Sequence, residues 1–283
     1  DALAGLGAVY ITPLVNPPTL SGYTAPQVSL NPYYIQLPQC SISSNPYGGS
    51  TGTYGLLNCL AIQRGGVTVI IRFYLPPGGY GVLLSFQSAQ YPSTSMPADW
   101  ISWVYVGLDG KLRIVDAWNY PVYSAIGSLP ITPGWHTIMA TEYYNNGLYP
   151  IIVYLDGPST YASSSIGSPN VPGIVGGDGP FPYGDIGTGY SYEWPGGNGG
   201  WFFFDGVIQY IAIYPGNSTM NSYLINSGVF NIANQQLPVP GYAIDYPPDG
   251  TEPIVVGAYA STPVGLSILL PSQLGIINYA IHV

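Results

Sequence analysis

The sequence predicts an all-β protein, built as a sandwich of antiparallel strands. Three features of the 283 residues indicate this class. Runs rich in Val, Ile, Tyr, Phe and Trp are separated by clusters of Gly and Pro, which is typical of strands joined by turns. Several of these runs alternate between apolar and polar positions with a period of two. Helical patterns are scarce, and a single short helix is predicted at 219–225.

The composition excludes several classes of protein. Charged residues make up only 6% of the chain, against roughly 25% in ordinary globular domains. Because 47% of the residues are hydrophobic and 14% are aromatic, the chain can build a core and is not expected to be disordered. Its apolar runs are far shorter than the roughly 20 residues of a membrane-spanning helix. Four basic residues and a net charge of −9 disfavour a nucleic-acid partner.

A surface with so few titrating groups keeps a nearly constant charge as the pH changes, so its stability depends little on pH. This indicates an extracellular, cell-surface protein of an acidic and hot habitat. The alternative is a phage or surface protein with an uncharged polar surface at neutral pH. The chain begins at Asp1 without a signal-peptide pattern, so we interpret it as a processed N-terminus.

Residues 1–20 differ from the rest of the chain. They are uncharged beyond Asp1, small and apolar, and a strand is expected at 7–15 with Val9, Ile11 and Leu14 as its apolar positions. An apolar strand followed by a tether of Pro, Gly, Ser and Thr is what donation of a strand to a neighbouring subunit requires. An ordinary first strand of the chain's own sheet is the alternative.

Residues 21–236 are the expected sandwich, and turn residues set its hairpins. A hairpin is predicted around the Pro76–Gly79 turn, a second at Asp109-Gly110, and a third at Asn145–Gly147, since Gly supplies the positive φ that such turns need. Residues 158–200 are predicted to form a long surface loop. Strands are predicted at 33–37, 54–62, 67–75, 80–86, 100–108, 111–118, 134–144, 148–155 and 201–214.

Residues 237–283 have a different sequence pattern, with short expected strands divided by Pro and Gly turns. They form either a small C-terminal β module or additional strands on the sandwich. Strands are predicted here at 242–245, 253–259, 266–270 and 276–283.

The two cysteines, Cys40 and Cys59, are expected to form one disulfide across a Gly/Ser-rich loop, with two buried thiols as the alternative. Such a bridge contributes roughly 3 kcal/mol in the chain-entropy model. A Cys-x-x-Cys pair and a Cys/His zinc spacing are both missing from the sequence.

The order of these segments resembles the laminin-G or concanavalin A-like jelly-roll family. The resemblance covers roughly residues 60–230. It implies a jelly-roll β-sandwich and is weakly specific for function, because this fold carries lectins, adhesion modules and hydrolases. It rests on residues 67–75, 83–86, 106–112, 134–141, 151–157 and 204–214.

An enzyme is not expected. The hydrolases of that family carry clustered carboxylates on one strand, whereas Glu142, Glu193 and Glu252 are far apart in the sequence. We interpret His136 as a structural histidine of a strand, because no nucleophile and acid accompany it. The Gly-x-Ser-x-Gly match at 48–52 lies in a loop and is read as chance.

Several polar and aromatic positions are candidate binding sites. Asp178, Asp185 and Asp205, with Asp156 further away, could surround a Ca²⁺ ion, but no cofactor or metal is assigned because solvated loop carboxylates explain them as well. Asn217 begins a glycosylation sequon, Asn-Ser-Thr. The predicted loop at 158–200 carries aromatic residues that could stack on glycans or pack at a subunit interface: Tyr183, Tyr190, Tyr192 and Trp194.

The composition of the chain, together with its apolar N-terminal strand, also resembles that of subunits of extracellular filaments, thread- or pilus-like, of hyperthermophilic archaea. That resemblance implies a structural glycoprotein whose partners are copies of itself, joined by donated strands. A carbohydrate-binding adhesion module or viral spike protein, with surface glycans as partners, is the alternative function.

Overall fold

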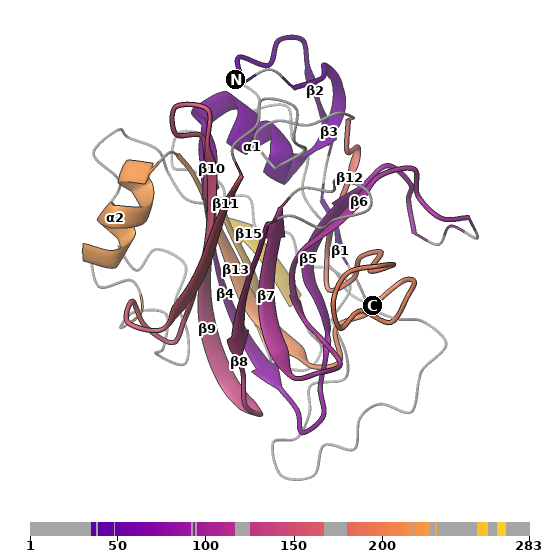
Figure 1. Cartoon of the computed structure of the whole chain (residues 1–283), viewed down its shortest axis with the longest axis vertical. Helices are drawn as coiled ribbons and strands as arrows, with labels where there is room; N and C mark the ends of the chain where they lie inside the picture. Colours follow the sequence, from indigo (N-terminus) through magenta and orange to yellow (C-terminus); the bar gives the residue numbers. More distant parts are fainter. Residues whose placement is uncertain are drawn as a thin grey trace.

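The computed structural model describes residues 35–37, 39–47, 49–91, 93, 95–116, 125–166, 180–216, 218–226, 230, 254–259 and 265–269. Its two large antiparallel sheets pack face to face, which confirms the predicted all-β sandwich (Figure 1). The first sheet has six described strands, in the order β1 (Ile35–Gln36), β12 (Tyr183–Ile186), β5 (Gly81–Gln87), β6 (Trp100–Val106), β7 (Lys111–Asp116) and β8 (Ala125–Pro130). The second has seven, in the order β11 (Tyr161–Ile166), β10 (Tyr149–Leu155), β9 (Gly134–Tyr143), β4 (Gly66–Leu75), β13 (Val207–Pro215), β14 (Ile254–Tyr259) and β15 (Gly265–Leu269).

The core lies between the two sheets and follows the period-two pattern of the sequence. Val69, Ile71 and Phe73 of β4 are fully buried, whereas Arg72 and Tyr74 on its other face are only half-buried. Burial of one such large apolar side chain contributes roughly 1.5–3 kcal/mol. The alternation therefore places one face of β4 in the core and the other towards the outside of the sandwich.

Two of the three predicted hairpins are confirmed. Strands β6 and β7 pair around Asp109-Gly110, and Gly110 has a φ of 69°. Strands β9 and β10 pair around Asn145–Gly147. There, two backbone hydrogen bonds of 2.8 and 3.0 Å join Asn145 to Leu148, and both central residues have positive φ, as a type I′ turn requires.

The predicted hairpin around Pro76–Gly79 is wrong, because its two strands belong to different sheets. Strand β4 pairs with β9 and β13, whereas β5 pairs with β6 and β12. The segment Leu75–Gly81 crosses from one sheet to the other. Gly81 is needed at the crossing, since a Cβ atom there would lie only 1.9 Å from the Phe203 carbonyl oxygen. A Pro/Gly turn signal thus identifies a reversal of the chain but not whether the strands pair.

The predicted weak strand at 54–62 is also wrong, because helix α1 (Leu56–Arg64) occupies most of it. Residues 56–62 are all buried, so an apolar run of this length carries neither helical nor strand periodicity. Leu, Ala, Gln and Arg favour a helix, and Gly65 ends it with a φ of 75°, its N–H donating to the Ala61 carbonyl. Helix α1 closes one end of the sandwich, at the top of Figure 1.

The long surface loop predicted at 158–200 is only partly correct. Strands β11 and β12 lie within it, one at the edge of the seven-stranded sheet and one inside the six-stranded sheet. Along one side of the sandwich β11 packs against β8, where a Cβ atom at Gly127 would lie 3.1 Å from the Ala162 backbone. The Ser-rich sequence of β11 concealed it, since strand patterns are recognised by apolar residues.

The predicted short helix is confirmed as α2 (Ser218–Asn226), which lies on the outer face of the seven-stranded sheet (Figure 1). Leu224 and the nearby Phe230 pack there against Ile70 and Met139. No helix among the described residues is long and apolar enough to cross a membrane.

The two ends of the chain differ in how far they are described. The strand predicted at 7–15, with Val9, Ile11 and Leu14, lies outside the described residues, as do the strands predicted at 242–245 and 276–283. Strands β14 and β15 are described, and β14 pairs with β13 over Ile254–Gly257. They extend the seven-stranded sheet.

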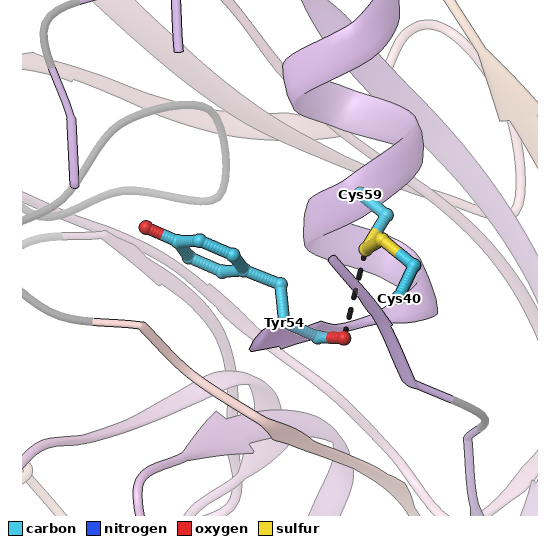
Figure 2. Close-up of a disulfide and its surroundings, with 3 residues drawn as sticks. All are labelled: Cys40, Tyr54 and Cys59. Carbon is cyan, nitrogen blue, oxygen red and sulfur yellow. Dashed lines mark hydrogen bonds between the residues drawn. A yellow bond between two sulfur atoms is a disulfide. The ribbon is translucent and has the colours of Figure 1, made fainter. Parts of the chain in front are cut away.

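Cys40 and Cys59 form the predicted disulfide, with Cα atoms 6.4 Å apart (Figure 2). Cys40 belongs to β2 (Gln39–Ile42), which pairs with β3 (Gly52–Gly55) in a separate two-stranded sheet. Cys59 belongs to α1, and its sulfur lies 3.6 Å from the Tyr54 carbonyl oxygen. A disulfide sulfur carries no proton, so this is a packing contact. The bridge fastens the small sheet to the helix that closes the sandwich.

Candidate functional site

A continuous line of aromatic side chains crosses the outside of the six-stranded sheet. We call five of them, each exposed to some degree, the aromatic row; the sixth ring, Trp100, is buried beneath it. Neighbouring ring centroids lie 5.1 to 6.2 Å apart in edge-to-face contact, the geometry that aromatic pairs prefer. The aromatic row consists of Phe203, Tyr91, Trp201, Tyr190 and Tyr192.

Hydrogen bonds hold the aromatic row in place. The Trp201 indole donates to the Ser93 carbonyl over 3.2 Å, and the Trp100 indole donates to the Tyr192 carbonyl over 3.0 Å. The backbone of the segment 187–206 is itself folded back, with Tyr190 and Trp201 in a β-bridge. Rings held in this way lose little conformational freedom when a partner binds, which favours a binding surface.

The structure separates the four aromatic residues predicted as binding candidates. Tyr190 and Tyr192 lie in the aromatic row, and Tyr192 is 40% exposed. Tyr183 is a half-buried residue of β12. Trp194 is only 3% exposed and belongs to the core, so its assignment as a surface aromatic is wrong and the packing alternative applies. Its position in a Gly/Pro-rich segment gave no sign of this burial.

Three members of the aromatic row were missed by the sequence analysis. Trp201 and Phe203 were assigned to the strand predicted at 201–214, but β13 begins only at Val207. Tyr91 follows β5 in a segment that carried no motif. The four successive aromatic residues at 201–204 were a usable signal. Neighbouring residues of an extended chain point to opposite sides, so some of these four rings must lie outside the core.

A second aromatic surface lies on the outer face of the seven-stranded sheet. The Arg72 guanidinium lies 5.5 Å from the centre of the Trp135 ring and donates to the Thr137 hydroxyl over 2.9 Å. The Tyr74 ring lies 5.5 Å from the same Trp135 ring. The cation is therefore already engaged with the ring and hydroxyl beside it.

His136 has a structural environment. Its Nδ1 atom lies 2.8 Å from the Asp156 carboxylate and its Nε2 atom 2.6 Å from the Thr132 carbonyl oxygen. Burial alone would raise the pKa of the Asp156 carboxyl, but the hydrogen bonds from His136 and from the Thr137 amide outweigh it, and this pKa is lowered. Both ring nitrogens are thus occupied, and the contact with Asp156 holds the end of β10 onto β9.

The candidate calcium ligands are dispersed. Asp156 bonds to His136, and Asp185 lies buried in the six-stranded sheet, bonded to Gln87. Asp205 is half-buried beside the crossing segment, where its amide donates to the Tyr80 carbonyl, and burial raises the pKa of its carboxyl. Asp178 and the sequon residue Asn217 lie outside the described residues. Within the described ranges, no three His, Cys, Asp or Glu side chains come together as metal ligands.

Glu142 carries a carboxyl group that is buried between the two sheets. It lies on β9, is fully shielded from solvent, and accepts a hydrogen bond of 3.0 Å from the Trp103 indole on β6. The contact joins the two sheets through the middle of the core. Glu193 is instead exposed, on the segment after β12.

The edges of the sheets are the other candidate interaction sites. The six-stranded sheet begins with the two-residue strand β1, directly after residues 1–34. The seven-stranded sheet ends at β15, Gly265–Leu269, and among the described residues only β14 pairs with it. Its sequence, Gly-Leu-Ser-Ile-Leu, has no charge and no proline to block the addition of another strand.

Comparisons with known proteins identify no family. No family model matches the chain, and no curated protein matches it. Among solved structures, the enzymatically active domain of tailspike protein 2 of bacteriophage CBA120 aligns with 69% of this chain and 29% of its own, at 15% identity and a TM-score of 0.34. Full-length tailspike protein 2 from an Escherichia coli O157:H7 bacteriophage aligns with 81% of this chain, again at 15% identity, with a TM-score of 0.36. The chain thus spans 29% of the length of these two proteins.

Proposed function

We propose that this protein is a structural subunit of an extracellular filament and that its subunits join by donated strands. In this proposal, residues 7–15 of one subunit pair with the outer edge of β15 in the next. The observation that carries the proposal is the uncharged, proline-free edge of β15 at the end of the seven-stranded sheet. An edge of this kind is a template for another strand, and backbone hydrogen bonds supply the affinity.

Three properties support this assignment. The packing of β11 on β8 closes one side of the sandwich, and among the described residues no strand pairs with the outer edge of β15 on the opposite side. Donation of a strand from each subunit to the β15 edge of the next is a head-to-tail contact, which propagates as a fibre instead of closing as a dimer. The disulfide suits a protein that works outside the cell.

Removal of the donor tests the proposal. Deletion of residues 1–16 is expected to give a folded monomer that no longer polymerises, as judged by electron microscopy and sedimentation. Point variants sharpen the test, since Val9→Asp and Ile11→Asp place a charge on the apolar face of the strand and should also prevent assembly. Thr12→Asp, off that face, is the matched control and should assemble. Filaments of normal length from the deleted protein would contradict strand donation.

A second function, carbohydrate binding by an adhesion module, is favoured by the aromatic row. Half-exposed rings held in a fixed line can stack on the apolar faces of sugars, and each such contact is lost when its ring is truncated. Trp201→Ala and Tyr192→Ala should then abolish binding on a glycan array. Tyr161→Ala is the matched control, because Tyr161 is 56% exposed but lies on β11 in the other sheet.

A further inference from the structure

Asp185 carries a carboxyl group that is buried one strand in from the β1 edge of the six-stranded sheet. It lies on β12, which separates β5 from the edge strand β1, and only 1% of it is exposed. Its backbone is paired with Ser85 on β5 and with Gln36 on β1. Paired residues of neighbouring strands share a face of the sheet, so the carboxyl group faces a strip of uncharged polar side chains.

Gln87 is the side chain that holds this carboxyl group. The Gln87 amide nitrogen donates to Asp185 Oδ2, and Gln87 is itself fully buried. The remaining oxygens of the pair, Asp185 Oδ1 and Gln87 Oε1, are both buried and have no hydrogen-bond partner among the residues that the structure describes. An ionised carboxylate cannot satisfy Gln87 Oε1, because a carboxylate has no proton to donate.

A neutral carboxylic acid removes this defect. Its hydroxyl can donate to Gln87 Oε1 while the Gln87 amide donates to the other carboxyl oxygen, and the two side chains then form a closed pair with two hydrogen bonds. We propose that Asp185 and Gln87 form such an acid–amide pair, and that loss of its proton to solvent loosens β1 from β12. Acidic conditions would keep the sheet edge closed, and neutral to alkaline conditions would release it.

Within the described part of the chain, no charged group contributes to stabilising the ionised form. Ser85 on β5 donates its hydroxyl to the Thr188 carbonyl, and Gln36 on β1 accepts a hydrogen bond from Gln90. Among the described residues, burial and the Gln87 hydrogen bond are the causes that shift this group. Burial, opposed in part by Gln87, raises the pKa of the Asp185 carboxyl from 3.8 to about 7. The edge therefore titrates near neutrality.

The sign of the effect follows from proton binding. The closed edge holds the proton more tightly than an opened edge. The closed form is therefore stabilised fully below the ordinary pKa of aspartate, and this stabilisation is lost as the pH rises through the raised pKa that Asp185 has in the folded protein. The Leu37 amide reports on this edge, since it donates to the Gly184 carbonyl over 2.7 Å. Its protection against hydrogen exchange should fall by roughly a hundredfold between about pH 5 and about pH 9, if opening exposes the carboxyl group.

Hydrogen exchange of the full chain tests this proposal, with protection factors corrected for the intrinsic pH dependence of exchange. Asp185→Asn keeps an amide pair but cannot ionise, so the protection of Leu37 should be independent of pH. The Leu155 amide, bonded to the Thr160 carbonyl in the other sheet, is the internal control and should not change in either protein. An equal fall in the variant, or no fall in the wild type, overturns the proposal.

A direct titration keeps the test decisive if Asp185→Asn does not fold. The carboxyl carbon of Asp185 can be followed by NMR in the wild-type chain labelled at aspartate. Titration near neutrality supports the acid–amide pair. Titration at the ordinary pKa of aspartate would show that Asp185 is already ionised in mildly acidic solution, and it would overturn the acid–amide pair.

Discussion

Removal of the disulfide is the perturbation whose magnitude follows most directly from the structure. Cys40 and Cys59 are 19 positions apart, so the bridge closes a loop of that size. In the chain-entropy model this closure contributes about 3 kcal/mol by restricting the unfolded chain. Cys59 lies in the buried helix α1 and is 1% exposed, so its truncation to alanine adds roughly 1 kcal/mol. The double alanine variant should therefore lose about 4 kcal/mol of unfolding free energy.

Equilibrium unfolding in urea measures this loss. The wild-type protein unfolded with a reductant is the matched control, because it loses the bridge but keeps both side chains. We expect it to be about 3 kcal/mol less stable than the oxidised protein, with the remaining difference due to the buried sulfur. A change below about 1 kcal/mol in the reduced protein would refute the reasoning from loop closure.

Three further predictions concern substitutions of single residues. Trp103→Phe removes the indole donor from the buried Glu142 carboxyl group and should lower the free energy of unfolding in urea by about 3 kcal/mol. Glu142→Gln keeps an acceptor for the indole and should lower it less. Equal losses in the two variants would contradict this. The pKa of the Asp156 carboxyl is lowered in the folded protein, so its ionised form stabilises the fold above the ordinary pKa of aspartate. This stabilisation is lost as the pH falls through the lowered pKa. Thermal unfolding of Asp156→Asn should then differ from the wild type at neutral pH and converge with it in acid. Gly81→Ala should prevent folding or cost more than about 3 kcal/mol, whereas Gly110→Ala, with a positive φ but open space around it, should cost about 1 kcal/mol.

The strands of the core could be predicted because they carry their own pattern. The alternation around Ile71, and the turn residues at Gly110 and Gly147, depend on neighbours in the sequence and are visible without the fold. The sheet to which each strand belongs was not visible. The prolines at 76 and 77 mark a reversal, but the crossing between sheets depends on the backbone of Phe203, more than a hundred residues away.

The candidate surfaces were predicted less well, for two physical reasons. A ring in a Gly-rich segment has no periodicity, so burial of Trp194 and exposure of Tyr192 look alike in the sequence. Helix α1 was missed because a helix buried on all sides lacks an amphipathic pattern. The acid–amide pair joins Gln87 to Asp185 across two strands, and no local motif announces a contact between residues so far apart.

Site-specific cross-linking tests strand donation between subunits most directly. One cysteine replaces Ile11 in the proposed donor and a second replaces Ser267 on β15, and the assembled protein is oxidised mildly and separated under denaturing conditions. Strand donation predicts a ladder of covalent oligomers for this pair. The control, Ile11→Cys with Ser128→Cys on β8 at the closed side of the sandwich, should give none. Cross-links that form only within single chains, or equally with both partners, would contradict donation to the edge of β15.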